Sequence, residues 1–265
     1  MGGRGTVNDG KDWVMRVVRW ILVSGVACVV AAMAPMQAHA TSVSPIQLEM
    51  TAAGPKSRMQ VTATNSGQAP LALEAQVQRI ELDENGQQTT TKAGDEFLIF
   101  PPQAMVPPGG TQVFRVEWLG GPDLAKSQSY QLALSQIPVK LPKNQSAAVQ
   151  VVMSFGVLIN VAPVKGSPQV KLVGTGISGG DKKAADRRPT ITVENASNVH
   201  ALLQDATIRL SSGSWSQTLS PGDFAQKVGM GLVQPGKRRK FTLPFEVPAS
   251  VTSIQASIDY TPKRP

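Results

Sequence analysis

Beyond residue 40 the chain consists of short runs rich in Val, Ile, Leu and Thr, each ended by Gly, Pro or Asn, and no long stretch follows a helical repeat. Short runs of this kind are typical of an all-β sandwich. The sequence "DENG" at 83–86 predicts a hairpin turn between two of them. About seven strands within about 120 residues indicate an immunoglobulin-like domain. The predicted strands are Ser44–Thr51, Arg58–Asn65, Leu71–Leu82, Glu96–Phe100, Thr111–Trp118, Ser129–Ile137 and Ala147–Val161.

The second half of the chain repeats motifs of the first half. The sequence "VTATNSGQAPLALEAQVQRI" from Val61 resembles "ITVENASNVHALLQDATIRL" from Ile191, and "PPGGTQVFRVEW" from Pro107 resembles "QPGKRRKFTLPF" from Gln234. The paired motifs are separated by about 130 and 127 residues, which is close to one domain length. We therefore predict two tandem immunoglobulin-like β-sandwich domains, residues 41–163 and 164–265.

The first forty residues have the three parts of a secretory signal peptide. Basic residues extend to Arg19, the apolar stretch "WILVSGVACVVAAMAPM" follows, and "AHA" places small residues before Thr41. We predict that residues 1–40 are cleaved on export, whether the initiator is Met1 or Met15. Cleavage lowers the net charge from +8 to +6, because the segment carries four basic and two acidic residues. This charge suits an anionic partner or a membrane surface, and export argues against nucleic acid.

The cleaved chain has little equipment for catalysis. Loss of Cys28 and His39 leaves no thiol and one histidine, His200, whereas Ser/His/Asp and Cys/His catalysis need a base beside a nucleophile. No group of His, Cys, Asp and Glu has the spacing of metal ligands, and the adjacent carboxylates of Asp83 and Glu84 lie in a turn. We predict a protein that is not an enzyme, has no cofactor or metal, and carries His200 at its surface.

Three further motifs invite functional readings. The sequence "GTGISG" at 174–179 fits G-x-G-x-x-G, but dinucleotide binding needs a helix to begin there, and "GDKKAADRRP" follows. A flexible loop is the expectation. The basic clusters at 182–188 and 236–240 lie among Gly and Pro and are predicted to be solvated loops.

A run without charged residues extends from Asn144 to Val164. Its length raises the possibility of a transmembrane helix, but polar and β-branched residues and Pro163 favour a strand, so we predict that the chain does not span a membrane. Alternation places Val149, Val151, Met153 and Phe155 on one wholly apolar face. A long apolar strand at a sheet edge is a template for another chain's strand; alternatively, these side chains fill the domain's own core.

The motifs "PPGGTQVFRVEW" and "SQSYQLALSQIPV", followed by a long apolar strand ending in Pro163, resemble the periplasmic pilus-assembly chaperones of the PapD-like family. The opening Ser44-Pro45 and "SFGVLINVAP" are similar to its archaic, spore-coat-protein-U-type branch. The resemblance implies that the two domains are set in an angled arrangement with a cleft between them and that the protein is located in the periplasm. It also implies donor-strand complementation, in which the chaperone lends its last domain-one strand to a pilin or fimbrial subunit and delivers it to an outer-membrane usher. Alignment on Pro163 implies that Val149, Val151 and Met153, and also Phe155, face the subunit.

The chain departs from this family at one point. Many members hold the subunit's C-terminal carboxylate with Arg in the first strand and Lys in the last, and these positions correspond to Gln47 and Leu158, neither of them basic. Arg115 or Arg79 is the expected substitute from a neighbouring strand. An exported two-domain adhesion or ligand-binding module is the alternative function. The sequence leaves open which subunits are bound and whether the free protein caps its edge as a dimer.

Overall fold

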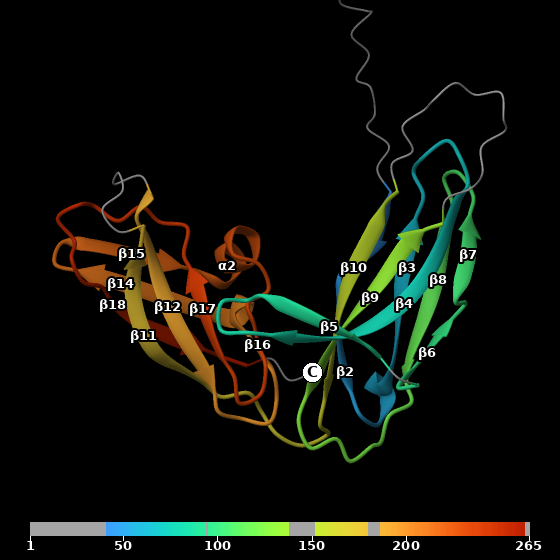
Figure 1. Cartoon of the computed structure of the whole chain (residues 1–265), viewed down its shortest axis with the longest axis horizontal. Coiled ribbons are helices and arrows are strands. Elements are labelled where there is room, and N and C mark those ends of the chain that lie inside the picture. Colours follow the sequence, from blue (N-terminus) through green and yellow to red (C-terminus); the bar gives the residue numbers. More distant parts are fainter. Residues whose placement is uncertain (1–40, 94, 138–151, 180–185, 263–265) are drawn as a thin grey trace, which may run out of the picture. The chain divides into compact units, whose positions relative to one another are not determined.

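Nearly every regular element in the computed structural model is a β-strand (Figure 1). The structure describes residues 41–93, 95–137, 152–179 and 186–262. The predicted signal peptide, residues 1–40, therefore lies outside the described residues. Within the described part of the chain, no helix is long and apolar enough to cross a membrane.

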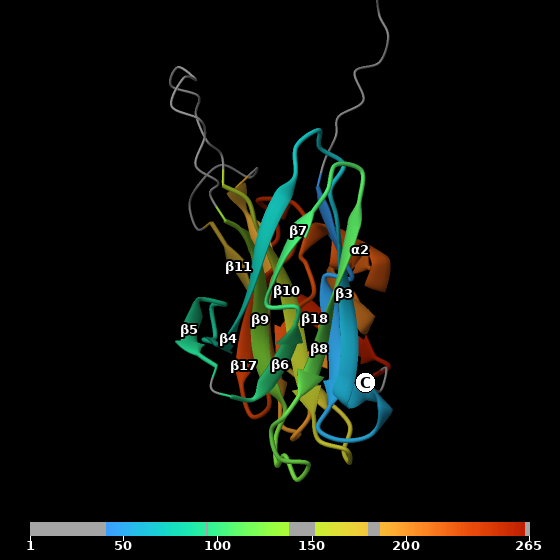
Figure 2. The same cartoon turned by 90° about the vertical axis from the view of Figure 1, so that its right-hand side faces the viewer.

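Residues 42–162 form two sheets. Sheet A has the strand order β1-β3-β8-β6, and sheet B has the order β2-β10-β9-β4-β5, with β7 also paired to β4. Figures 1 and 2 show the strands of the two sheets facing one another. The elements are β1 (Ser42–Ser44), β2 (Gln47–Thr51), the 3-10 turn η1 (Pro55–Ser57), β3 (Arg58–Thr64), β4 (Leu71–Leu82), β5 (Gln88–Lys92), β6 (Phe97–Phe100), β7 (Gln103–Val106), β8 (Thr111–Trp118), β9 (Gln128–Gln136) and β10 (Ser154–Ala162).

Residues 170–260 form a second set of sheets, with the orders β11-β12-β17, β13-β16 and β15-β14-β18. Among the described strands, none of this set pairs with a strand of sheets A and B. The elements are β11 (Val170–Ser178), β12 (Arg188–Asn195), β13 (Ala201–Leu202), η3 (Leu203–Asp205), β14 (Ala206–Ser212), β15 (Trp215–Leu219), α2 (Pro221–Lys227), β16 (Leu232–Val233), β17 (Arg238–Thr242) and β18 (Gln255–Tyr260).

Each set of sheets encloses its own hydrophobic core. Alternate residues of the central strands point inward in the first set, as Leu132 on β9 and Val157 and Ile159 on β10 do, all with no exposed surface. The second core forms around Ile191, Phe224 and other apolar side chains of its own sheets. The prediction of an all-β protein with two sandwiches is therefore confirmed.

The repeat seen in the sequence has the same geometry in both halves. Asn65 follows β3, and Asn195 ends the corresponding strand β12. The side-chain amide of each Asn donates hydrogen bonds to the carbonyl oxygen four residues later (2.8 Å) and to that of Val106 or Val233 (3.0 Å). The glycine of each following Pro-Gly turn has φ of 69°. Identical turns thus close the same strand connection twice.

The structure corrects three expectations. The motif "GTGISG" is not a loop, since its residues from Gly174 to Ser178 belong to β11 and pair with β12. The cluster at 236–240 is not entirely a loop, because β17 begins at Arg238. The predicted first strand is two strands, β1 in sheet A and β2 in sheet B.

Candidate functional site

Strand β10 has a different neighbour on each side. On one side β9 runs antiparallel to it along Ser154–Val161. On the other side β2 runs parallel to it, but this pairing begins only at Leu158. Among the described residues, no strand pairs with Ser154–Val157 on the β2 side. The first half of β10 therefore has an open edge, which we define as Ser154–Val157.

The direction of the backbone groups along this open edge follows from the hydrogen bonds at its ends. Gln136 N–H donates to the Met153 carbonyl at 2.8 Å, so odd-numbered residues bond to β9. Leu158 N–H donates to the Ile46 carbonyl at 3.0 Å, so even-numbered residues face the opposite side. Because this direction alternates along a strand, the N–H and C=O groups of Ser154 and Gly156 point out from the open edge. Both residues are exposed.

The edge is open because the first strand of the fold changes sheets. Ser42–Ser44 pairs with β3 in sheet A, whereas Gln47–Thr51 pairs with β10 in sheet B. The chain crosses between the sheets at Pro45 and Ile46, just before the position beside Leu158. Residues that would otherwise have extended β2 along Ser154–Val157 are therefore used in sheet A.

Apolar side chains lead from the core to the start of β10. Val157 is fully buried, Phe155 packs against the same core while partly exposed, and Met153 is 37% exposed. These odd-numbered residues share one face of the strand. Val152 lies on the opposite face of the strand and is 52% exposed. Val149 and Val151 lie outside the described residues, so their assignment as donor side chains stays a prediction.

The structure brings Gln47 and Leu158 together as direct partners in the β2–β10 register. The two expected substitute cations lie on other strands. Arg115 is exposed on β8 of sheet A, opposite Gln60 and Phe100. Arg79 lies on β4, 3.8 Å from a carboxylate oxygen of Glu81. Their role as a carboxylate anchor stays a prediction.

His200 is not at the surface, contrary to the sequence-based expectation. Its side chain is only 2% exposed, and Nε2 lies 2.6 Å from Oε2 of Glu49 on β2. The other oxygen of Glu49 accepts a hydrogen bond of 2.8 Å from the Asn160 amide on β10. Ser127 Oγ accepts the His200 backbone N–H and contacts Nδ1, both at 3.1 Å. The imidazole therefore ties the second half of the chain to β2 and, through Glu49, to β10.

This cluster contains the residue types of a hydrolase, but its bonds are structural. Ser127 is only 8% exposed, and its hydroxyl accepts a backbone N–H, whereas a nucleophile must be free to approach a substrate. Among the described residues, no group of three or more His, Cys, Asp and Glu could hold a metal ion.

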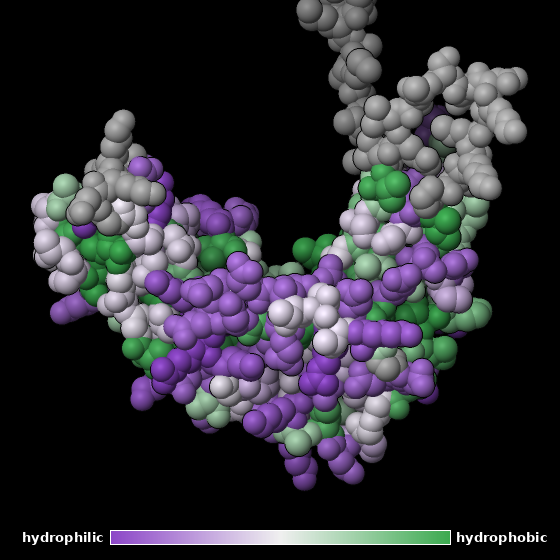
Figure 3. Space-filling model, in the orientation of Figure 1, coloured by the Kyte–Doolittle hydropathy of each residue, from purple (hydrophilic) through white to green (hydrophobic). Residues whose placement is uncertain are grey.

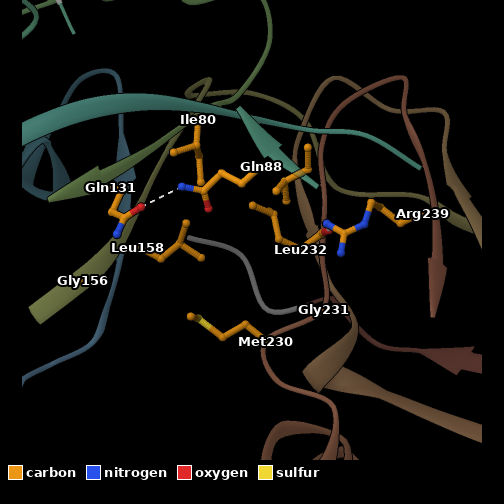
Figure 4. A pocket seen from close by; sticks show the side chains of 10 residues that line it. Ile80, Gln88, Gln131, Gly156, Leu158, Met230, Gly231, Leu232 and Arg239 are labelled. Carbon is orange, nitrogen blue, oxygen red and sulfur yellow. Dashed lines mark hydrogen bonds between the residues drawn. The ribbon is translucent and has the colours of Figure 1, made fainter. Parts of the chain in front are cut away.

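A pocket of about 290 Å³ lies beside Leu158, on the face of sheet B opposite to the core (Figure 4). Leu158 and Gly156 of β10 line it together with Ile80 and Leu82 of β4. The remaining wall includes Met230–Leu232 and Arg239 from the second half of the chain. On the face shown in Figure 3, hydrophilic residues cover most of the middle and hydrophobic residues form separate patches. The sequence patterns did not predict this pocket. The one signal was Gly156, because a glycine inside a strand often marks a site where a ligand or another backbone approaches closely.

Comparisons with known proteins place these features in context. Residues 42–164 match the family model described as pili and flagellar-assembly chaperone, PapD N-terminal domain. No curated protein sequence matches the chain.

Several solved structures are similar to the chain. A chain of the Salmonella enterica SafA pilin–SafB chaperone complex is 12% identical, with a TM-score of 0.51, over 79% of this chain and 86% of that one. A chain of the Acinetobacter baumannii CsuC–CsuE chaperone–tip adhesion subunit complex is 14% identical, over 80% and 94%, with a TM-score of 0.48. The E. coli chaperone DraB is 18% identical, over 78% and 86%, with a TM-score of 0.47.

Proposed function

We propose that the chain is a pilus-assembly chaperone of the PapD-like family, because residues 42–164 match the model of that family's N-terminal domain. In this role it binds pilin or fimbrial subunits in the periplasm by donor-strand complementation and delivers them to an outer-membrane usher. In this proposal residues 1–40 are the cleaved signal, residues 41–163 form the subunit-binding domain, and residues 164–265 form the second domain. The protein carries out no bond chemistry.

The open edge of β10 is the observation that supports this proposal. A subunit that lacks its final strand has an unpaired edge and an apolar groove. Ser154 and Gly156 present main-chain donors and acceptors to the edge, and Met153 supplies a partly exposed apolar side chain on the core-facing side of the strand. In this proposal Val151 and Val149 continue that apolar face, as the alternation of the sequence predicts. Strand addition of this kind draws affinity from main-chain bonds and specificity from alternate side chains.

The side chains can supply the larger share of the binding free energy. Burying each large apolar side chain contributes roughly 1.5–3 kcal/mol. Val149, Val151 and Met153 together therefore contribute about 5–9 kcal/mol before ordering costs. That is comparable to the total stability of a small domain, so it is enough to hold an incomplete subunit in a folded state.

The test is co-expression of the chaperone with a pilin subunit from the same organism and affinity recovery of the complex. Met153→Asp and Val151→Asp should each abolish subunit recovery, because a carboxylate would enter an apolar groove unpaired. Val152→Asp is the matched control: its side chain is exposed on the opposite face, so recovery should stay at the wild-type level.

Circular dichroism and thermal unfolding of each purified variant establish that the chaperone itself is folded. Normal subunit yield with both Met153→Asp and Val151→Asp would eliminate the donor-strand assignment. Unfolding of the chaperone by both substitutions would instead show that these side chains fill its own core.

A further inference from the structure

Another pocket, of about 480 Å³, lies where the β14–β15 hairpin turns. This volume is within the range of pockets that hold small ligands. One wall comes from the hairpin, and the other comes from the segment between β17 and β18. The lining residues include Ser212, Ser214 and Trp215 on the first wall and Pro248, Ser250 and Val251 on the second.

The hairpin wall has a fixed geometry. Ser212 and Trp215 are direct partners in the β14–β15 register, so only Gly213 and Ser214 form the turn. Gly213 has φ of 56°, a left-handed value that glycine adopts without steric cost. Trp215 is partly buried and packs against the core of the second half. The indole is therefore held in place while it also lines the pocket.

The opposite wall is fastened by Arg187, which does not itself line the pocket. Its Nη1 and Nη2 atoms donate hydrogen bonds of 2.6 Å to the carbonyl oxygens of Pro248 and Val251, respectively. The Val247 N–H donates to the Arg187 carbonyl at 3.1 Å. Both walls are thus held before any ligand arrives, which lowers the ordering cost of binding.

The lining favours an uncharged ligand with several hydroxyl groups. No charged side chain among the described residues lines the pocket, so an anion or a cation would find no counter-charge in it. In the same part of the chain, the hydroxyls of Ser212, Ser214 and Ser250 have no hydrogen-bond partner. Each can both donate and accept. A purely apolar ligand would displace water from these hydroxyls without replacing its hydrogen bonds.

Trp215 adds an aromatic surface to this polar lining. The face of an aromatic ring carries partial negative charge, so it attracts polarised C–H groups. A pyranose ring presents C–H groups on its faces and hydroxyls around its rim. It can therefore contact the indole and the serine hydroxyls at the same time, which a linear polyol does less well because it has no stiff ring face.

We propose that this pocket binds a neutral pyranose ring, with Trp215 against one face of the sugar and the serine hydroxyls bonded to its rim. The ring can be a free sugar or one unit of a glycan chain. Because a single ring has few atoms, its dissociation constant should be in the millimolar range. The site goes beyond the proposed chaperone function and does not depend on it.

The test is an NMR titration of the full chain with the methyl glycosides of glucose, galactose and N-acetylglucosamine. The indole N–H resonance of Trp215, assigned with Trp215→Phe, is followed. We expect a saturable shift with at least one glycoside and none with sorbitol, the acyclic control. The Trp118 resonance should stay in place, because Trp118 lies in the core of the first half.

Two results of this titration would overturn the proposal. They are the lack of a saturable Trp215 shift with every glycoside and an equal response to sorbitol. The comparison is made in the wild-type protein, so it needs no variant to fold.

Ser250→Ala and Ser216→Ala form a matched pair of variants. Both serines are exposed, but only Ser250 lines the pocket. Ser250→Ala should weaken binding of the best glycoside about two- to twelvefold through the lost hydrogen bond, whereas Ser216→Ala should bind as the wild type does. Unchanged binding by Ser250→Ala, or an equal loss in both variants, would count against the proposal.

A trisaccharide of the best-binding sugar distinguishes the two sources. Its three rings raise the apparent affinity by about threefold on statistical grounds alone. A larger gain identifies a glycan chain as the ligand, because neighbouring rings then make contacts of their own. A gain of threefold or less identifies a single free sugar.

The sugar pocket and the donor strand are tested independently, because neither Met153 nor Val151 is among the lining residues. Met153→Asp should bind the glycoside as the wild type does, and Ser250→Ala should recover the subunit at the wild-type level. If the glycosides do not bind but Met153→Asp loses the subunit, only the pocket proposal fails.

Discussion

Along β10 the backbone N–H groups point alternately to β9 and to the open edge, so the effect of a proline depends on which residue it replaces. The N–H of Ser154 faces the open edge, whereas that of Phe155 faces β9. Proline lacks an N–H and is tolerated at the first residue of a strand, which is the position of Ser154. Ser154→Pro should therefore leave the chaperone folded and remove one donor available to a bound subunit.

The magnitude follows from the carbonyl left unpaired in the subunit. In the complex that carbonyl is buried between strands, and an unsatisfied buried acceptor costs about 1–3 kcal/mol. This corresponds to about 5- to 150-fold weaker binding. The substitution also removes the 2.8 Å contact between the hydroxyls of Ser154 and Ser135, which is exposed and contributes little.

The assay is competition during subunit refolding, with equal amounts of the variant and of differently tagged wild-type chaperone. The ratio of the two complexes recovered gives the relative affinity. Ser154→Ala retains the N–H and should compete within about twofold of wild type. Phe155→Pro breaks the β9 ladder and should lower the urea midpoint of the chaperone itself. Equal competition by a folded Ser154→Pro would refute pairing of the subunit along this edge.

Two further predictions concern stability. Asn195→Asp should lower the free energy of unfolding by about 2–5 kcal/mol in urea titrations, because a buried carboxylate would face the carbonyl oxygens of Val199 and Val233; a loss below about 0.5 kcal/mol would contradict the assigned hydrogen bonds. Burial raises the pKa of Tyr260 from 10.0 to about 12, so the unfolded chain loses this proton first and stability should fall as pH rises from about 10 to about 12. Tyr260→Phe should show a smaller fall in urea midpoint over that interval, and an equally steep fall would show that Tyr260 is not responsible.

The strands that could be predicted from the sequence are those with a clear apolar pattern and definite turns. β4 and β8 have the predicted bounds, and the turn at 83–86 joins β4 to β5. β5 was missed because all its residues are polar and exposed, so the pattern carries no signal of burial. β7 was missed because it is short and its sequence, QAMV, contains a single β-branched residue, whereas the equally short β6, FLIF, is wholly apolar.

The parts of the site that could be predicted are those that depend on a local sequence pattern, not on contacts between residues far apart in the chain. The sequence predicted an apolar strand before Pro163, and the family resemblance assigned the two anchor positions to Gln47 and Leu158. The structure shows that these two residues are direct partners in the β2–β10 register. The sequence did not reveal the buried position of His200, because the carboxylate beside that imidazole, on Glu49, is 151 residues away. The sequence also did not single out Arg239 within the cluster "GKRRK", because composition does not show which of several basic residues becomes buried in the fold.

The two copies of the repeated Pro-Gly turn differ at the position of Gln234. The corresponding residue of the first half, Pro107, has no side-chain hydrogen-bonding group. Gln234 is 5% exposed; its amide donates to the Ile80 carbonyl at 3.0 Å and accepts the Leu82 N–H at 2.9 Å. The turn of the second half is thereby fastened to the end of β4, where the β4–β5 hairpin begins. Any mechanical load on that hairpin is passed directly to the second half of the molecule, because separation would first have to break both hydrogen bonds.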